Sequence, residues 1–61
     1  MRNLTHDELK EIDKEGEMLK DIGYKMCITH SFDVLNDLCD IALKSVRKIY
    51  EINKKRFDDE R

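Results

Sequence analysis

The sequence predicts an all-α protein, an antiparallel helical hairpin that homodimerises into a four-helix bundle. Apolar residues recur every three or four positions through both halves of the chain, which is the spacing of amphipathic helices. Proline is absent, glycine occurs twice, and 43% of the residues are charged although the formal net charge is only -2. Regular apolar spacing combined with charges of both signs is typical of helical bundles and coiled coils. We expect one domain over residues 1–61.

The first helix is predicted over about residues 5–27. Thr5 begins it, because its hydroxyl can accept a hydrogen bond from the Glu8 amide while the Glu8 carboxylate accepts one from the Thr5 amide. We expect the two glycines of this helix to let a facing helix approach closely, with Leu35 or Leu43 filling the space. The expected apolar stripe consists of apolar and small residues at three-four spacing, namely Leu9, Ile12, Gly16, Leu19, Gly23 and Met26.

A turn is predicted at about residues 28–31, where the apolar stripe changes phase. Continuing the first stripe along one helix would use His30, whereas the second half places its stripe on Leu35 and Cys39. The two stripes differ by about two residues, or roughly 200° around a helix. Ser31 is suited to cap a second helix. One continuous long helix is the alternative interpretation.

The second helix is predicted over about residues 32–57, with an apolar arc of about 200°. One antiparallel neighbour cannot cover so wide an arc, whereas a second hairpin can. A 61-residue chain also builds a small core, worth roughly 3–5 kcal/mol, and such domains usually need a partner chain, a metal or disulfides. The predicted dimer core therefore combines residues of both helices: Leu35, Leu38, Cys39, Ala42, Val46, Ile49, Gly16, Leu19 and Gly23.

The leading functional hypothesis is a small non-catalytic regulator or adaptor that dimerises and binds another protein. Its partner-binding surface would be the part of the apolar arc that dimerisation leaves uncovered, for which we select Val34, Ile41, Ile52 and Phe57. A purely structural self-assembly role is an alternative, and it predicts that no apolar patch remains once the dimer forms.

A basic stretch in the second helix suggests RNA binding as a further alternative. The candidate contacts to nucleic acid are Lys44, Arg47, Lys48, Lys54 and Lys55. We favour a structural interpretation, because cations suit the carboxyl end of a helix. In an antiparallel hairpin these cations would also lie beside the acidic start of the first helix.

No residue pattern indicates catalysis, a metal or a cofactor. Cys27 and His30 have half of a zinc-site spacing, but a structural site needs four ligands within reach. We expect Cys27 and Cys39 to be reduced thiols, buried or half-buried, and too far apart for an intrachain disulfide. We expect no small-molecule substrate. No apolar run matches a membrane span or a signal peptide, so a cytoplasmic location without membrane contact is the expectation.

The second half of the chain resembles Rop, the family of plasmid copy-number proteins that form dimers of helical hairpins. The matching residues are Asp37-Leu38-Cys39-Asp40, Ile49-Tyr50 and Arg56-Phe57 followed by acidic residues. The resemblance implies the dimeric bundle, with Cys39, Val46 and Asn53 at one core position and Leu35, Ala42 and Ile49 at the other.

Rop-type proteins bind paired RNA loops through a Phe, amides and lysines on the exposed face of the first helix. Here the first helix is acidic, contains no Phe and has Tyr24 as its one aromatic residue. The resemblance therefore carries over the architecture and no RNA-binding residue.

Overall fold

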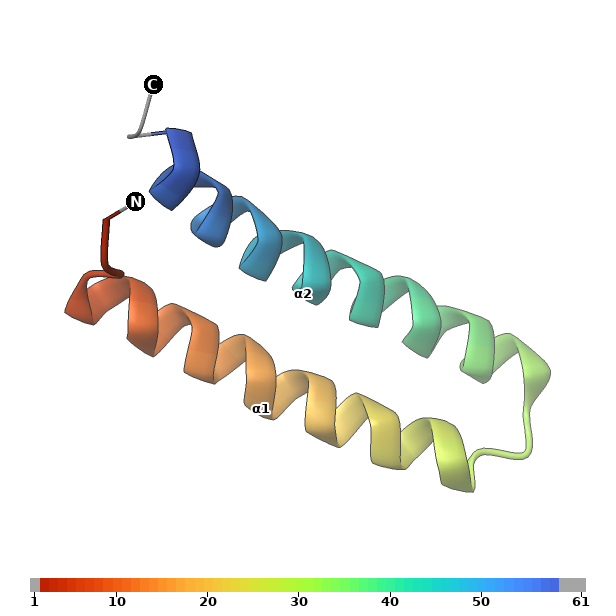
Figure 1. Cartoon of the computed structure of the whole chain (residues 1–61). Coiled ribbons are helices and arrows are strands. Elements are labelled where there is room, and N and C mark those ends of the chain that lie inside the picture. Colours follow the sequence, from red (N-terminus) through yellow and green to blue (C-terminus); the bar gives the residue numbers. More distant parts are fainter. Residues whose placement is uncertain (1, 59–61) are drawn as a thin grey trace.

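Two antiparallel α-helices lie side by side in a single layer in the computed structural model, which describes residues 2–58 (Figure 1). Helix α1 spans His6–Ile28 and helix α2 spans Phe32–Asp58. The layer measures 46 × 20 × 12 Å, and the start of α1 and the end of α2 lie at the end opposite the turn (Figure 1). The predicted all-helical hairpin is confirmed for the described part of the chain. Residues 1 and 59–61 of the predicted domain lie outside that part.

The first helix begins as predicted. The Glu8 amide donates to Thr5 Oγ1 at 3.2 Å, and the Thr5 amide donates to Glu8 Oε1 at 2.9 Å. Arg2 reinforces this cap, because its guanidinium donates to both carboxylate oxygens of Glu8 at 2.7 and 2.9 Å. These bonds satisfy amides that an isolated helix end leaves without partners. Helix α1 ends at Ile28, one residue later than expected.

The turn between the helices comprises residues 29–31 and uses side-chain hydrogen bonds instead of glycine or proline. The Ser31 amide donates to Thr29 Oγ1 at 3.2 Å. The Val34 amide donates to Ser31 Oγ at 3.3 Å, so Ser31 caps α2 as predicted. No described residue, glycine included, has positive φ. The connection is therefore short and unstrained, which keeps the helices antiparallel.

The hairpin interface consists of the buried and half-buried residues that alternate at spacings of three and four along both helices. Ile22 is 5% exposed and is the one apolar residue that is fully buried in the described part of the chain. The other members remain half-buried because a single layer leaves both broad sides open, except for the polar pair Glu15 and Ser45, which are fully buried. The interface comprises Ile12, Glu15, Leu19, Ile22 and Met26 of α1, and Leu35, Leu38, Ala42, Ser45, Ile49 and Ile52 of α2.

The predicted apolar stripes are partly wrong in phase. Gly16 and Gly23 are exposed, and the preceding residues Glu15 and Ile22 occupy the interface. No atom lies within 4 Å of a Cβ built on either glycine, so neither Leu35 nor Leu43 fills that space within one chain. In α2, Leu38 and Ser45 take interface positions expected for Cys39 and Val46, which are exposed. Pattern reasoning excluded Glu15 because it is charged, whereas Ser45 and Lys48 accommodate its carboxylate.

Removing the buried Ile22 side chain should destabilise the hairpin more than any change at its surface. We expect Ile22→Ala to lower the free energy of unfolding by about 2–4 kcal/mol, through lost burial and a residual cavity. The measurement is urea-induced unfolding followed by far-ultraviolet circular dichroism. Ile28→Ala is the matched control because Ile28 is 54% exposed, and its expected loss is below about 1 kcal/mol. Equal losses for the two variants would contradict the assigned interface.

Candidate interaction surfaces

A polar group occupies the middle of the hairpin interface. The Glu15 carboxylate is 2% exposed, and its Oε1 lies 3.4 Å from the Nζ of Lys48 on the other helix. Hydrogen bonding from Ser45, followed by the charge of Lys48, lowers the pKa of Glu15 against the opposing effect of desolvation. Within residues 2–58, Glu15 Oε2 has no hydrogen-bond partner. This contact aligns the helices, with Glu15 level with Ser45 and Lys48.

A second carboxylate is held at the open end of the hairpin. Hydrogen bonds from the Arg2 side chain and the Thr5 amide lower the pKa of Glu8 to about 2. Arg56 of α2 also reaches this end, where its Nε donates to the Arg2 carbonyl at 3.1 Å. The cap of α1 is thus tied to the last turns of α2.

One broad side of the hairpin carries a line of exposed apolar side chains on α2. Cys39 and Val46 directly follow interface residues, so they project from the same side of α2. Val46 is 51% exposed and Phe32 is 73% exposed. We call this line the apolar ridge, and it comprises Phe32, Cys39, Leu43, Val46, Tyr50 and Phe57.

On α1 the same broad side is low over the middle of the helix, and Leu9, 49% exposed, lies on the same line in the first turn. Gly16 and Gly23 directly follow the interface residues Glu15 and Ile22. In an antiparallel pair, positions that follow the interface project from the same side on both helices. The glycine surface, formed by Gly16 and Gly23, therefore lies beside the apolar ridge. Given the alignment of Glu15 with Ser45 and Lys48, Gly16 is level with Val46 and Gly23 is level with Cys39.

Both cysteines are free and exposed in the single chain. The expectation of buried or half-buried thiols is therefore wrong for the hairpin by itself. The physical reason is that Cys39 lies on the apolar ridge instead of in the hairpin interface, where Leu38 takes its place.

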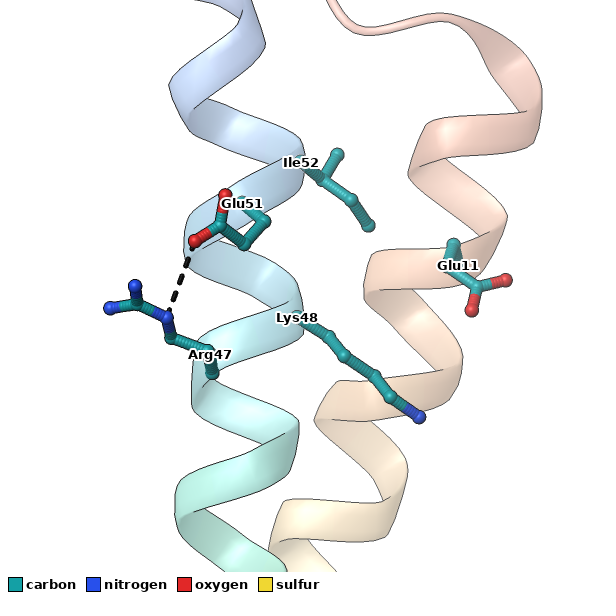
Figure 2. A pocket seen from close by; sticks show the side chains of 5 residues that line it. All are labelled: Glu11, Arg47, Lys48, Glu51 and Ile52. Carbon is teal, nitrogen blue, oxygen red and sulfur yellow. Dashed lines mark ion pairs between the residues drawn. The ribbon is translucent and has the colours of Figure 1, made fainter.

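The opposite broad side contains an open cleft of about 350 Å³ (Figure 2). Figure 2 shows Ile52 and Lys48 extending from α2 toward α1, with Glu11 on α1, while Arg47 and Glu51 pair on the outer side of α2. The Arg47 Nε lies 3.2 Å from Glu51 Oε1. The cleft thus has an apolar side chain, Ile52, bordered by the aliphatic stems and charged ends of its neighbours.

The structure divides the predicted partner-binding residues between the two sides. Val34 and Ile41 precede Lys48 at intervals of seven residues, so they share the side that contains the cleft with Ile52. They are 44% and 43% exposed. Phe57 instead belongs to the apolar ridge on the other side. Sequence reasoning missed this division because it depends on which stripe faces the other helix.

The predicted dimer-core residues are divided as well. Leu19, Leu35, Leu38, Ala42 and Ile49 lie in the hairpin interface, where they are half-buried. Gly16, Gly23, Cys39 and Val46 are exposed on the side of the apolar ridge. The first group borders the second along the length of the molecule, so both would be covered together by a chain that packed on this side.

The basic residues of α2 lie at its surface. Arg47 pairs with Glu51, and its guanidinium carbon lies 5.2 Å from the centre of the Tyr50 ring. Lys48 is paired with Glu15, which is an ion pair between the helices as expected from their opposite charges. Lys44, Lys54 and Lys55 are exposed. Two of the five predicted nucleic-acid contacts therefore already have an acidic partner.

Two features are absent from residues 2–58, a cluster of metal-binding side chains and a helix suited to span a membrane. No group of three or more His, Cys, Asp or Glu side chains is placed to hold a metal ion there. Neither of the two helices, as far as they are described, is long and apolar enough to cross a membrane.

Comparison with protein-family models, with curated proteins and with solved structures finds no match for this chain. The resemblance of α2 to Rop therefore stays a prediction.

Acid should weaken the hairpin through Glu8 and Glu15. The pKa of Glu8 falls from 4.5 to about 2 on folding, and that of Glu15 also falls. The unfolded chain therefore binds more protons, so these carboxylates contribute stability above about pH 4.5 that is lost as the pH falls toward about 2. We expect the free energy of unfolding to decrease over that interval, as measured by urea titrations at several pH values. Glu8→Gln and Glu15→Gln should each flatten this pH dependence.

The matched control for the acid titration is Glu17→Gln, an exposed residue of the same helix. This variant should keep the pH dependence of the unmodified chain. A pH dependence that is unchanged in Glu8→Gln and in Glu15→Gln would contradict the assigned interactions.

Proposed function

We propose that this protein is a small non-catalytic regulator or adaptor, which homodimerises into a four-helix bundle and binds another protein. The observation that carries the proposal is the amount of apolar surface left on a chain with one fully buried apolar residue in its described part. Soluble proteins rarely leave contiguous apolar patches without a binding role. The division of this surface between two sides supports two contacts, one with a second copy and one with a different protein.

The side with the apolar ridge is assigned to the dimer. Covering it would bury Cys39, Leu43, Val46 and Tyr50 together with the open flanks of the hairpin interface. The broad side measures 46 by 20 Å, about 900 Å². This projected area is large enough to hold an interface of standard size, in which each partner buries roughly 800 Å² of accessible surface.

The side with the cleft is assigned to the other protein. Val34 and Ile41 remain exposed there, and the Ile52 side chain lines the cleft. An apolar side chain of a partner would be bordered by Glu11 and by the ion-paired Arg47 and Lys48. Most of the charged groups around this cleft already neutralise one another, which favours a binding surface over acid–base chemistry.

The test of the dimer is the mass of the untagged protein in solution, from size-exclusion chromatography with light scattering. The single chain has a mass of 7.3 kDa, so we expect about 15 kDa for the dimer. Val46→Glu should give the monomer mass, because the dimer would bury an unpaired charge. Lys44→Glu is the matched control outside the apolar ridge and should keep the dimer mass. A monomeric unmodified protein would contradict the proposal.

The test of the second contact is a pull-down from a cell lysate. It compares the unmodified protein with a Val34→Asp, Ile41→Asp double variant, after the dimer mass of each has been verified. We expect the unmodified protein to retain a specific partner protein and the double variant to lose it. Equal retention would contradict the assigned surface. Absorbance at 260 nm separates the RNA alternative, because co-purified nucleic acid that is lost at high salt and in Lys44→Glu would favour that function instead.

A further inference from the structure

The side proposed for dimerisation is uneven, with most of its bulk on α2 and, apart from Leu9 in the first turn, little on α1. Val46 and Cys39 of the apolar ridge are level with Gly16 and Gly23 of the glycine surface. Around both glycines the space is open, since no atom lies within 4 Å of an added Cβ. Glycine destabilises a helix interior relative to alanine. Two such positions on one exposed side are consistent with close approach of another chain at this surface.

Two symmetric pairings can bring this side of one hairpin onto the same side of another, and they differ in the direction of the two-fold axis. When the axis runs across the helices, each helix meets its own copy. The apolar ridge then meets a second apolar ridge, while the two glycine surfaces face each other across empty space. When the axis runs parallel to the helices, the apolar ridge of each copy meets the glycine surface of the other. The second pairing places bulky side chains opposite open space, which suits the close packing of protein interiors better than bulk opposite bulk.

Charges at the edges of this side agree with the axis parallel to the helices. Asp13 and Lys20 border the glycine surface on α1, and Asp40 and Arg47 border the apolar ridge on α2. Arg47 lies against the Tyr50 ring of the ridge, 5.2 Å from its centre. With this axis, each Asp13 approaches an Arg47 of the second copy at nearly the same height, and each Lys20 approaches an Asp40. Both edge pairs are then complementary, as the Asp13–Lys20 pair would be with the axis across the helices, so the choice between the two pairings rests on the shape of this side.

We propose that two copies pair about an axis parallel to the helices, so that α2 of each packs on α1 of the other and both turns lie at the same end. The inference rests on the proposed homodimer and specifies its geometry. It departs from an arrangement in which the turns lie at opposite ends. With both turns at the same end, the two clefts of the dimer also run in the same direction along the bundle. A partner would therefore meet two parallel binding sites.

The distance between the two turns tests the proposal directly. A spin label attached through His30→Cys, in a chain that also carries Cys27→Ala and Cys39→Ala, reports that distance by pulsed electron paramagnetic resonance. We expect a distance below about 30 Å, the width of two packed helix layers plus the labels. Turns at opposite ends would lie about 46 Å apart, the length of the hairpin, and that result would overturn the proposal.

A label at Lys44→Cys in the same background is the matched control. Lys44 lies near the middle of α2 and outside the apolar ridge, so both pairings give a short distance there. A short distance at position 44 with a long one at position 30 would leave the dimer intact and reject its proposed geometry. No measurable distance at either position would show that the chain is a monomer, which would overturn the dimer itself.

A charge exchange gives an independent measurement that keeps both cysteines. Asp13→Lys should weaken dimerisation about tenfold, because two symmetry-related exposed ion pairs are lost in each dimer. The double variant Asp13→Lys, Arg47→Glu should restore the affinity of the unmodified protein, because the introduced ammonium of each copy would then meet the introduced carboxylate of the other. With the axis across the helices, Asp13 lies near Lys20 of the second copy instead. The double variant would then remain as weak as the single one, which would reject the proposal.

Discussion

Two helices packed in a single layer can cover only one stripe of each other, and this constraint governs the rest of the molecule. The hairpin interface takes that stripe and fully buries one apolar side chain, Ile22, among the residues described. The apolar residues on either side of the interface remain in contact with solvent. The apolar arc of α2 is too wide for α1 to cover. The features that suggest interactions, the apolar ridge and the residues around the cleft, follow from this excess.

The alignment of the two helices depends on a polar contact instead of an apolar one. Glu15 is buried opposite Ser45 and within 3.4 Å of the Lys48 ammonium, so a shift of one helix along the other would leave its charge unpaired. This contact places Val46 level with Gly16 and Cys39 level with Gly23. On the side of the apolar ridge, side chains of α2 therefore lie beside glycines of α1. The buried carboxylate thus connects the pairing within one chain with the proposed pairing between two chains. Its Oε2 atom, which has no partner within residues 2–58, is the part of this contact that a single chain leaves incomplete.

Much of the fold could be predicted from local sequence. The Thr5 cap, the Ser31 cap and the ends of both helices depend on neighbouring residues, and the sequence predicts them to within about one residue. The choice of interface could not be made in this way, because Glu15 is suited to the interior only when Ser45 and Lys48 face it. The apolar periodicity placed Gly16 and Gly23 in the predicted stripe of the first helix. In the structure both glycines lie at the edge of the hairpin interface, on the side of the apolar ridge. The stripe favoured by pattern reasoning is therefore rotated toward the apolar ridge, as it would be if it faced the centre of a four-helix bundle.

That a second copy completes the core is tested most directly by the concentration dependence of folding. The measurement is urea-induced unfolding of the unmodified protein, followed by far-ultraviolet circular dichroism, at two protein concentrations a hundredfold apart. If folding and dimerisation are coupled, the higher concentration should stabilise the folded state by about 2.7 kcal per mole of dimer and raise the urea midpoint accordingly. A midpoint that is the same at both concentrations, with the mass of a single chain, would contradict the account, since the hairpin would then be stable alone with its apolar ridge exposed.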